Sequence, residues 1–355
     1  MKVLHVVGAR PNFMKLAPCA RALAAADHVA QRIVHTGQHY DEAMSESFFR
    51  DLEIPEPDLN LEVGSASHAV QTARIMERFE PVVTSEQPDW VVVYGDVNST
   101  VAAALVCSKL GIRLCHVEAG LRSGDRSMPE EINRLVTDRL ADLLLTPSPD
   151  GDENLLREGV DAGRIRFVGN VMVDTLIHAL PSARATGFRA SMGLEDDGYA
   201  LVTLHRPSNV DVAERLGRIC AALGAIARDM PVVFPMHPRT RGRLTDADRA
   251  ALGSVRVLEP TPYHATLDLT AGARVVITDS GGIQEETTAL GVPCLTLRDN
   301  TERPVTITEG TNRLVLDIGS LRDLALASRR GNALRRPAGW DGHAGERVAA
   351  ALTGS

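Results

Sequence analysis

The sequence predicts an α/β protein with two doubly wound halves, each built on a parallel sheet that helices cover on both faces. Short runs of apolar, β-forming residues recur along the chain, and helical stretches separate them. Most of these runs are almost continuously apolar, which is typical of strands buried on both faces of a parallel sheet. The length of 355 residues fits about two domains of ordinary size. We therefore expect one Rossmann-like domain over residues 1–170 and a second over residues 171–355, with the hinge in or just after Gly169–Asp174.

The individual elements follow from these runs and from the residues that interrupt them. In the first half the predicted strands are Lys2–Val7, Arg32–His35, Trp90–Tyr94, Arg113–Val117, Leu143–Thr146 and Ile165–Val168. In the second half they are Tyr199–Leu204, Val232–Pro235, Val255–Leu258, Arg274–Thr278, Cys294–Leu297 and Leu314–Val315. Helices are expected from Ser99 to Gly111, from about Val212 to Arg228, and over Gly345–Leu352. The sequence leaves open whether this last helix packs back on the first domain.

Composition and charge exclude several classes of protein. Hydrophobic residues make up 44% of the chain, so a packed globular protein is expected. The net charge is −8 without a basic block, which argues against nucleic acid or an anionic membrane as the partner. The longest apolar runs are shorter than a membrane span, and MKVLHVVGARPNF has the character of a first strand rather than a cleaved signal. The five cysteines form no CxxC pair, which predicts buried thiols in a reducing cytoplasm and no metal site.

Ionisable residues and glycines follow the predicted strands unusually often. In open parallel sheets the ligand lies beyond the carboxyl ends of the strands, so these are the positions where a ligand is expected. Neither GxGxxG nor GxxxxGK[ST] is present, so NAD and P-loop chemistry have little support. The cations at these positions indicate an anionic ligand, and they are Arg10, Lys15, Arg206 and Arg303.

The segment TDSGGIQEE (278–286) joins a strand to a helix and predicts a phosphate site. Gly281 and Gly282 leave backbone N–H groups bare at the helix start, and Ser280 is placed to cap the helix or to bond a phosphate oxygen. Either Glu285 or Glu286 is then placed to accept the hydroxyls of a ribose. The alternatives are close packing of the glycines and a favourable interaction of the glutamates with the helix dipole.

The segment HVEAGLRSGDRSMPEEINR (116–134) is the second dense one, and it predicts a group of carboxylates. Glu118 ends a strand and is expected to face the cleft between the halves, and Asp96 follows the neighbouring strand. One of Glu130 and Glu131 is expected to be only a helix-start carboxylate. Clustered acids raise one another's pKa, so a desolvated carboxyl can be held protonated as a general acid. His205 would approach from the opposite half.

Taken together in this order, the segments resemble the non-hydrolysing UDP-N-acetylglucosamine 2-epimerases over nearly the whole chain. The resemblance rests on GARPNFMKLAP, TGQHYDEAMSESFF, YGDVNSTVAAAL, HVEAGLRSGD with MPEEINR, VTLHRPSNV, TDSGGIQEE and RDNTERPVT. It implies a fold like that of the GT-B glycosyltransferases, with the substrate in an interdomain cleft. It also implies reversible conversion of UDP-N-acetylglucosamine to UDP-N-acetylmannosamine without NAD or another cofactor, by a cytoplasmic homodimer serving polysaccharide biosynthesis.

The resemblance also implies roles for individual residues. Arg10 and Lys15 would contact the nucleotide sugar, and Arg303 the sugar or the diphosphate. Ser280, Gly281 and Gly282 would hold phosphate and Glu286 the ribose, while the catalytic group would be Asp96, Glu118, Glu130 and His205. Gln38 and His39 would be the first place to look for a regulatory nucleotide-sugar site.

The chain departs from many relatives in ways that bear on the substrate. It has Asn12 where many have Glu, Pro207-Ser208-Asn209 after the His-Arg pair where many have an Arg and a Glu, and no Gln or Phe within 259–266 of the kind some relatives place around uracil. The alternatives are therefore a hydrolysing epimerase that releases N-acetylmannosamine and UDP, an epimerase for a modified UDP-sugar, a GT-B glycosyltransferase, and a nucleotide-sugar sensor without turnover.

Overall fold

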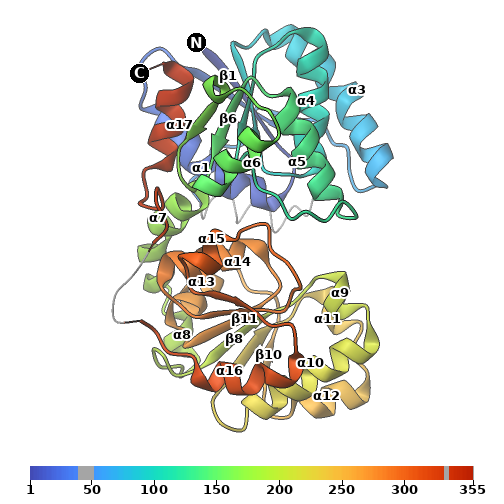
Figure 1. The fold of residues 1–355 in the computed structure, drawn as a ribbon, viewed down its shortest axis with the longest axis vertical. Helices are drawn as coiled ribbons and strands as arrows, with labels where there is room; N and C mark the ends of the chain where they lie inside the picture. The colour runs from blue at the N-terminus through green and yellow to red at the C-terminus, as the bar shows by residue number, and fades with distance from the viewer. Residues whose placement is uncertain (39–51, 332–335, 355) are drawn as a thin grey trace. The chain divides into compact units, whose positions relative to one another are not determined.

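The computed structural model of the chain describes residues 1–38, 52–331 and 336–354, which form two compact units (Figure 1). The first unit comprises Met1–His178 together with Ala338–Ser355, and the second comprises Ala179–Pro337. Each unit contains one all-parallel sheet with helices on both faces, so the two doubly wound α/β domains expected from the sequence are confirmed. The division lies inside helix α7 (Val171–Ala185), and the C-terminal helix belongs to the first unit.

The first sheet has seven strands in the order β3-β2-β1-β4-β5-β6-β7. Its strands are β1 (Lys2–Val7), β2 (Ala30–His35), β3 (Leu59–Asn60), β4 (Trp90–Tyr94), β5 (Leu114–Val117), β6 (Leu143–Thr146) and β7 (Ile165–Phe167). The chain moves outward from β1 to β3, then crosses back to β4 and continues in the opposite direction. The carboxyl ends of β1, β4 and β5 are therefore neighbours at the point where the order reverses.

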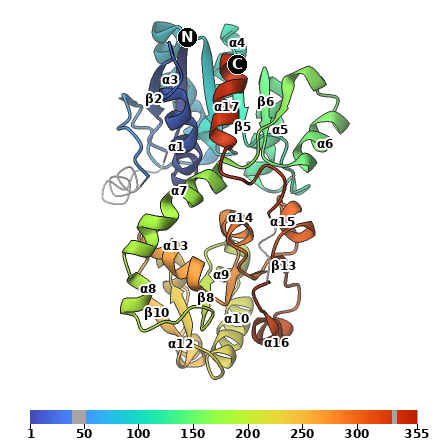
Figure 2. The same cartoon turned by 90° about the vertical axis from the view of Figure 1, so that its left-hand side faces the viewer.

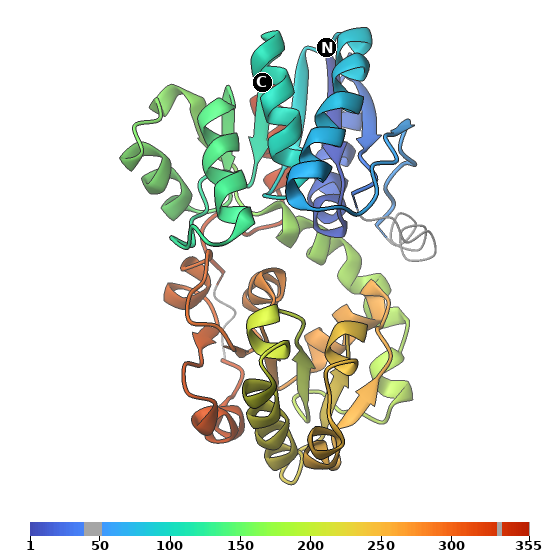
Figure 3. The ribbon, with the colours of Figure 1, turned by 90° about the vertical axis from the view of Figure 1, so that its right-hand side faces the viewer.

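Helices cover both faces of this sheet. Helices α1 (Arg10–Ala24) and α17 (Ala344–Thr353) lie side by side on one face (Figure 2). The other face carries α3 (His68–Glu86), α4 (Asn98–Leu110) and α5 (Pro129–Leu140) (Figure 3). Helix α6 (Pro149–Arg157) and the 3-10 turn η1 (Ala162–Arg164) connect β6 to β7.

The second sheet repeats the plan with six strands in the order β10-β9-β8-β11-β12-β13. Its strands are β8 (Ala200–Thr203), β9 (Val232–Pro235), β10 (Arg256–Leu258), β11 (Val275–Thr278), β12 (Cys294–Thr296) and β13 (Asn312–Leu314). Its helical elements are α8 (Phe188–Ser191), α9 (Pro207–Val210), α10 (Ala213–Ile226), α11 (Pro238–Arg241), α12 (Asp246–Leu252), α13 (Tyr263–Gly272), α14 (Gly281–Leu290), α15 (Val305–Thr308), η2 (Ile318–Ser320) and α16 (Leu321–Ala327). Here β8, β11 and β12 are the adjacent strands at the reversal.

The sequence assignments agree with these elements to within a few residues. The helix expected from Ser99 to Gly111 is α4, and Gly111 ends it in the left-handed conformation at φ 68°. All five cysteines are buried and free, as expected. The two-residue strand β3 was not predicted, because a pair of residues carries no periodic signal. Within the described residues, none of the helices has both the length and the apolar character needed to cross a bilayer.

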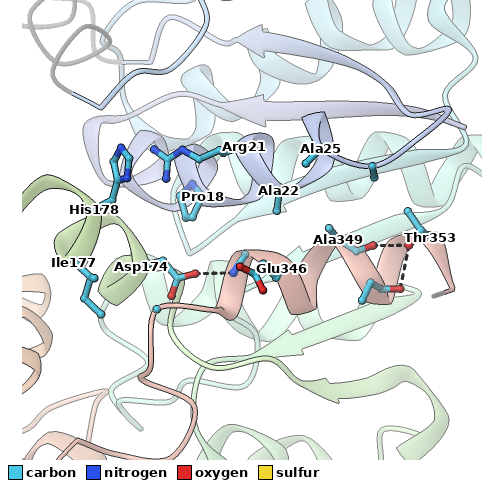
Figure 4. A pocket seen from close by; sticks show the side chains of 14 residues that line it. Pro18, Arg21, Ala22, Ala25, Asp174, Ile177, His178, Glu346, Ala349 and Thr353 are labelled. Carbon is cyan, nitrogen blue, oxygen red and sulfur yellow. Dashed lines mark hydrogen bonds between the residues drawn. The ribbon is translucent and has the colours of Figure 1, made fainter.

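The C-terminal helix α17 is anchored to the first unit by a buried hydrogen bond at its start. Asp174 of α7 accepts the backbone N–H of Gly345 at 2.7 Å, and burial raises the pKa of this carboxyl (Figure 4). Small residues allow α17 to approach α1 closely, and a groove of about 650 Å³ remains beside them, with Pro18 and Ala22 in its wall. A Cβ at Gly345 would lie 2.6 Å from the carbonyl oxygen of Pro18.

We predict that Gly345→Ala destabilises the first unit by about 1–3 kcal/mol, because backbone must move to admit the methyl group. Helix propensity alone predicts the opposite, a gain of up to about 1 kcal/mol. Urea unfolding measures the difference. The matched control is Gly217→Ala in α10, where the only close neighbour of an added Cβ is the side-chain oxygen Asp248 Oδ1 at 3.1 Å. Equal effects of the two substitutions would contradict this account of how α17 is seated.

Candidate functional site

Glu118 is the most tightly positioned carboxylate of the first unit. It follows β5 directly, has a left-handed backbone at φ 74°, and is 6% exposed. The ammonium group of Lys15, from α1, forms a buried ion pair with its Oε2. Gly95, after β4, has its Cα directly against this pair, so that a Cβ there would meet Lys15 Nζ and lie 3.2 Å from Glu118 Oε2. The ammonium group stabilises the ionised form of Glu118, as a proton acceptor requires.

Asp96, the next residue along the chain from Gly95, is partly exposed and is held by Arg134 of α5. Asn133 donates to the backbone carbonyl of Asp96 at 2.8 Å, so both the side chain and the main chain of Asp96 are fixed. A sequence of α5 therefore positions the turn after β4. The expected proximity of Asp96 and Glu118 follows from the adjacency of β4 and β5.

The structure distinguishes the two adjacent glutamates at the start of α5. Glu131 is buried, forms an ion pair with Arg134 at 2.6 Å, and accepts the N–H groups of Ser123 and Gly124 at 3.0 and 2.9 Å. Burial by itself raises the pKa of Glu131, but these donors outweigh it and the pKa is lowered. Glu131 thus holds the loop before α5 in place, whereas Glu130 is exposed.

In the second unit, Asp279 connects the end of β11 to the loop after β8. It is fully buried and accepts the N–H groups of His205 and Arg206 at 3.1 and 3.0 Å, and the amide of Asn209 at 3.1 Å. Its carboxylate also lies 3.2 Å from Nδ1 of His205, whose side chain is half exposed. Burial by itself raises the pKa of Asp279, but the bond from His205 and the other donors lower it below its usual range. Asp279 therefore stays ionised and orients His205.

Helix α14 begins at Gly281, beside a buried cluster of charges centred on Glu302. The Glu302 carboxylate contacts Arg303 at 2.5 Å and Arg298 at 2.8 Å, and lies 3.8 Å from Arg206. Burial raises the pKa of Glu302, but the arginines outweigh it and hold the pKa far below its usual range. A Cβ at Gly281 would lie 2.6 Å from a guanidinium nitrogen of Arg303. Arg303 therefore stands directly at the start of α14, where N–H groups and the helix dipole favour an anion.

The side chains around this helix start answer two questions left by the sequence. Ser280 makes no side-chain cap on α14, so of its two expected roles capping is absent. Glu285 pairs with Arg303 at 3.0 Å, while Glu286 is also buried, one residue further into the helix. Glu285 therefore has a partner within the protein, and Glu286 is the candidate for the ribose.

Two expected site residues have side chains outside the described part of the structure. Arg10 is the first residue of α1, but only its backbone is described, and His39 lies in the undescribed segment 39–51. Gln38 is described and buried, and its side-chain oxygen accepts from the backbone N–H and the hydroxyl of Ser99 at 3.1 and 2.8 Å. Gln38 thus supports the N-terminus of α4. Among the described residues, no group of three or more His, Cys, Asp or Glu is arranged to hold a metal ion.

Sequence reasoning did not identify the roles of Arg134 and Glu302. Each makes its contacts with residues brought in by another strand end or helix, so no local motif marks it. The one available signal was density of charge, because both lie in segments, MPEEINR and RDNTERP, that carry several ionisable residues within seven positions.

Comparisons with known proteins agree on one family. The model of the family described as UDP-N-acetylglucosamine 2-epimerase matches residues 21–353. A UDP-N-acetylglucosamine 2-epimerase of Methanocaldococcus jannaschii is 42% identical over 365 residues, covering 99% of each chain. A UDP-2,3-diacetamido-2,3-dideoxy-D-glucuronate 2-epimerase of Pseudomonas aeruginosa is 43% identical over 335 residues, covering 93% of this chain and 92% of that one. The crystal structure of the Methanocaldococcus jannaschii UDP-GlcNAc 2-epimerase in complex with UDP-GlcNAc and UDP superposes with a TM-score of 0.90 at 41% identity, covering 100% of each chain.

We predict that Glu302→Gln destabilises the second unit by about 3–5 kcal/mol, because it leaves buried guanidinium groups without their counter-charge. The control is Asp229→Asn, which removes the partner of Arg322 in a more exposed pair at 2.8 Å, where a change within about 1 kcal/mol is expected. Urea unfolding of both variants decides the matter. A Glu302 variant as stable as the Asp229 variant would show that the arginines are not held by Glu302.

Proposed function

The chain belongs to the UDP-N-acetylglucosamine 2-epimerase family, and from that premise we propose that it interconverts UDP-N-acetylglucosamine and UDP-N-acetylmannosamine by the non-hydrolysing route. In this route UDP is eliminated across C1–C2 of the sugar and then added back, with the C2 proton returned to the other face. The observation that carries the proposal is the group of carboxylates at adjacent strand ends, with Glu118 buried against Lys15 and Asp96 held by Arg134.

The chemistry of the sugar requires elimination rather than simple deprotonation. No carbonyl is attached to C2, so the C2 hydrogen is not acidic in the intact substrate. Departure of UDP from C1 gives that carbon oxocarbenium character, which makes the neighbouring C–H bond acidic enough to break. The neutral product of this step is a 2-acetamidoglucal. UDP must remain bound until it adds back, since its loss would end the cycle.

Proton transfer is assigned to the first unit. Glu118 takes the proton from C2, because its ion pair with Lys15 keeps it ionised and its buried position fixes its direction. A second acid must deliver a proton to the opposite face of C2, and Asp96 and Glu130 are the two candidates. Glu131 is not among them, because its oxygens are used by Arg134 and the backbone.

The diphosphate and ribose are assigned to the second unit. The N–H groups of Gly281 and Gly282 at the start of α14, the hydroxyl of Ser280 and the guanidinium of Arg303 hold the diphosphate. Glu286 accepts the ribose hydroxyls. His205, oriented by Asp279, donates from its other ring nitrogen to the departing diphosphate. Lys15 and Arg10 make further contacts with the nucleotide sugar.

A modified sugar is the second candidate substrate, and the relative from Pseudomonas aeruginosa favours it. That protein is described as acting on UDP-2,3-diacetamido-2,3-dideoxy-D-glucuronate and is 43% identical to this chain. The elimination chemistry is the same for both substrates, because the modifications lie at C3 and C6 and leave C1 and C2 unchanged. Comparing kcat/KM for the two sugars separates them.

We also propose that the protein acts in the cytoplasm as a homodimer and that its product enters polysaccharide synthesis. These assignments follow the resemblance set out above. The five buried free thiols support a reducing compartment.

We predict that turnover in heavy water places deuterium at C2 of the product, because the proton removed there exchanges with solvent before it is returned. Proton NMR of UDP-N-acetylglucosamine incubated with the enzyme measures this directly. Epimerisation without deuterium at C2 would exclude the elimination route. Anion-exchange analysis of the same reaction tests the hydrolysing alternative, in which free N-acetylmannosamine and UDP accumulate and no second UDP-sugar appears.

We predict that Glu118→Gln lowers kcat by roughly 10²–10⁴-fold, the range expected when a general acid or base is removed. The control is Glu77→Gln, which changes an exposed glutamate on α3 in the same unit and leaves kcat unaltered. Steady-state kinetics and a thermal unfolding curve of each variant are needed. A folded Glu118 variant with the wild-type kcat would remove Glu118 from the catalytic group.

A further inference from the structure

His116, on β5 below the proposed site, is completely buried and hydrogen-bonded at both ring nitrogens. Its Nδ1 lies 2.6 Å from a carboxylate oxygen of Asp138, on α5. Its Nε2 lies 2.8 Å from the backbone carbonyl oxygen of Gly95, in the turn after β4. The ring therefore bridges a helix and a neighbouring strand end, and the proposed mechanism gives it no role.

Both partners of this ring are acceptors only. A backbone carbonyl has no hydrogen to donate. Asp138 also accepts the N–H of Gly120 at 3.1 Å and an ion pair from Arg122 at 2.7 Å, so its carboxylate has donors on every side. Burial by itself raises the pKa of Asp138, but His116 and Arg122 outweigh it and lower the pKa. Two obligate acceptors are satisfied only if both ring nitrogens of His116 carry hydrogen, which makes the ring a cation.

A second buried histidine of the same sheet provides the contrast. His5, on β1, has Nδ1 at 2.8 Å from the hydroxyl of Tyr94 and Nε2 at 2.9 Å from the side-chain oxygen of Gln31. The tyrosine hydroxyl can donate, so a neutral ring satisfies both of its partners. Burial accordingly lowers the pKa of His5 to about 4. The two rings are equally buried, and they differ in whether a partner can supply a hydrogen.

The bonds of His116 and Asp138 fasten the two turns that carry the proposed catalytic carboxylates. His116 holds the carbonyl of Gly95, and Asp96 is the next residue. Asp138 holds the N–H of Gly120, two residues after Glu118. A change in this buried pair would therefore shift both turns relative to one another.

We propose that His116, as a buried imidazolium paired with Asp138, is a positioning residue that sets the spacing between Asp96 and Glu118. The proposal rests on the proposed function for the meaning of that spacing, but the charge on the ring stands on the hydrogen bonds alone. The surrounding charges allow it. Asp138 faces the ring directly, and Arg122 and Glu158 form an ion pair behind that carboxylate at 2.8 Å. The ion pair of Lys15 with Glu118 lies against Gly95 and is neutral as a unit.

The charge is tested by nitrogen-15 NMR of protein labelled at histidine, with the signals of His116 assigned by their loss in His116→Gln. We expect two protonated ring nitrogens at pH 7 for His116 and one for His5. A His116 ring with a single protonated nitrogen at pH 7 would overturn the proposal. This measurement needs no turnover, so it remains decisive even if the protein proves not to be an epimerase.

The positioning role is tested by kinetics of His116→Gln against the matched control His5→Gln, which removes a buried imidazole of the same sheet. We expect kcat of the His116 variant to fall about 10- to 100-fold, since small misplacements of reacting groups cost this much. KM and the inhibition constant of UDP should change less than about threefold, because the diphosphate is assigned to the other unit. The His5 variant should keep the wild-type kcat.

Unchanged kcat in the His116 variant, or an equal loss in both variants, would show that the imidazole only stabilises the fold. If the His116 variant does not fold, Asp138→Asn replaces it, because an amide keeps the shape while removing the counter-charge. We expect it to return His116 to a single protonated nitrogen and to lower kcat by a similar factor. Wild-type kcat or a still doubly protonated ring in Asp138→Asn would likewise overturn the proposal.

Discussion

The carboxyl ends of adjacent parallel strands share one edge of a sheet, and both candidate clusters depend on this constraint. In the first unit β1, β4 and β5 are neighbours, which brings the start of α1 together with the turns of Gly95 and Glu118. In the second unit β8, β11 and β12 are neighbours, which brings His205 to Asp279 and the Arg298–Arg303 segment to the start of α14. Segments up to about a hundred residues apart in the chain thus acquire fixed mutual geometry without any local motif to join them.

Charge compensation is the second feature that the two clusters share. A buried ion is costly unless it is paired and hydrogen-bonded, so each charge at these strand ends has a partner supplied by another element. Lys15 pairs with Glu118, Arg134 with Asp96 and Glu131, and Glu302 with arginines. Such networks fix side chains before a ligand arrives, and preorganised charge is what an elimination with a departing diphosphate requires.

Asn12 illustrates how the chain departs from many relatives while keeping local structure. Its side-chain oxygen accepts the N–H groups of Gly8 and Ala9 at 3.2 and 3.1 Å, and its amide nitrogen donates to the carbonyl of Tyr94 at 2.8 Å. The amide therefore closes the start of α1 and connects it to β4. A glutamate carboxylate in this position has no hydrogen for the Tyr94 carbonyl and adds a negative charge at the positive end of the helix dipole. The amide leaves that end of α1 more favourable to an anionic ligand.

The sequence by itself determined the strands, most helices and the segments that carry the chemistry. Continuous apolar runs mark doubly covered strands, and Gly, Pro and charged residues at their ends mark the turns, because these signals are local in the chain. Only the tertiary structure decided what each charged side chain does. The separation of Glu130 from Glu131, the pairing of Glu285 with Arg303, and the bridge from His116 to Asp138 and Gly95 all depend on strand register and helix orientation. These contacts are made across the sheet by residues far apart in sequence, so no periodicity or motif along the chain encodes them.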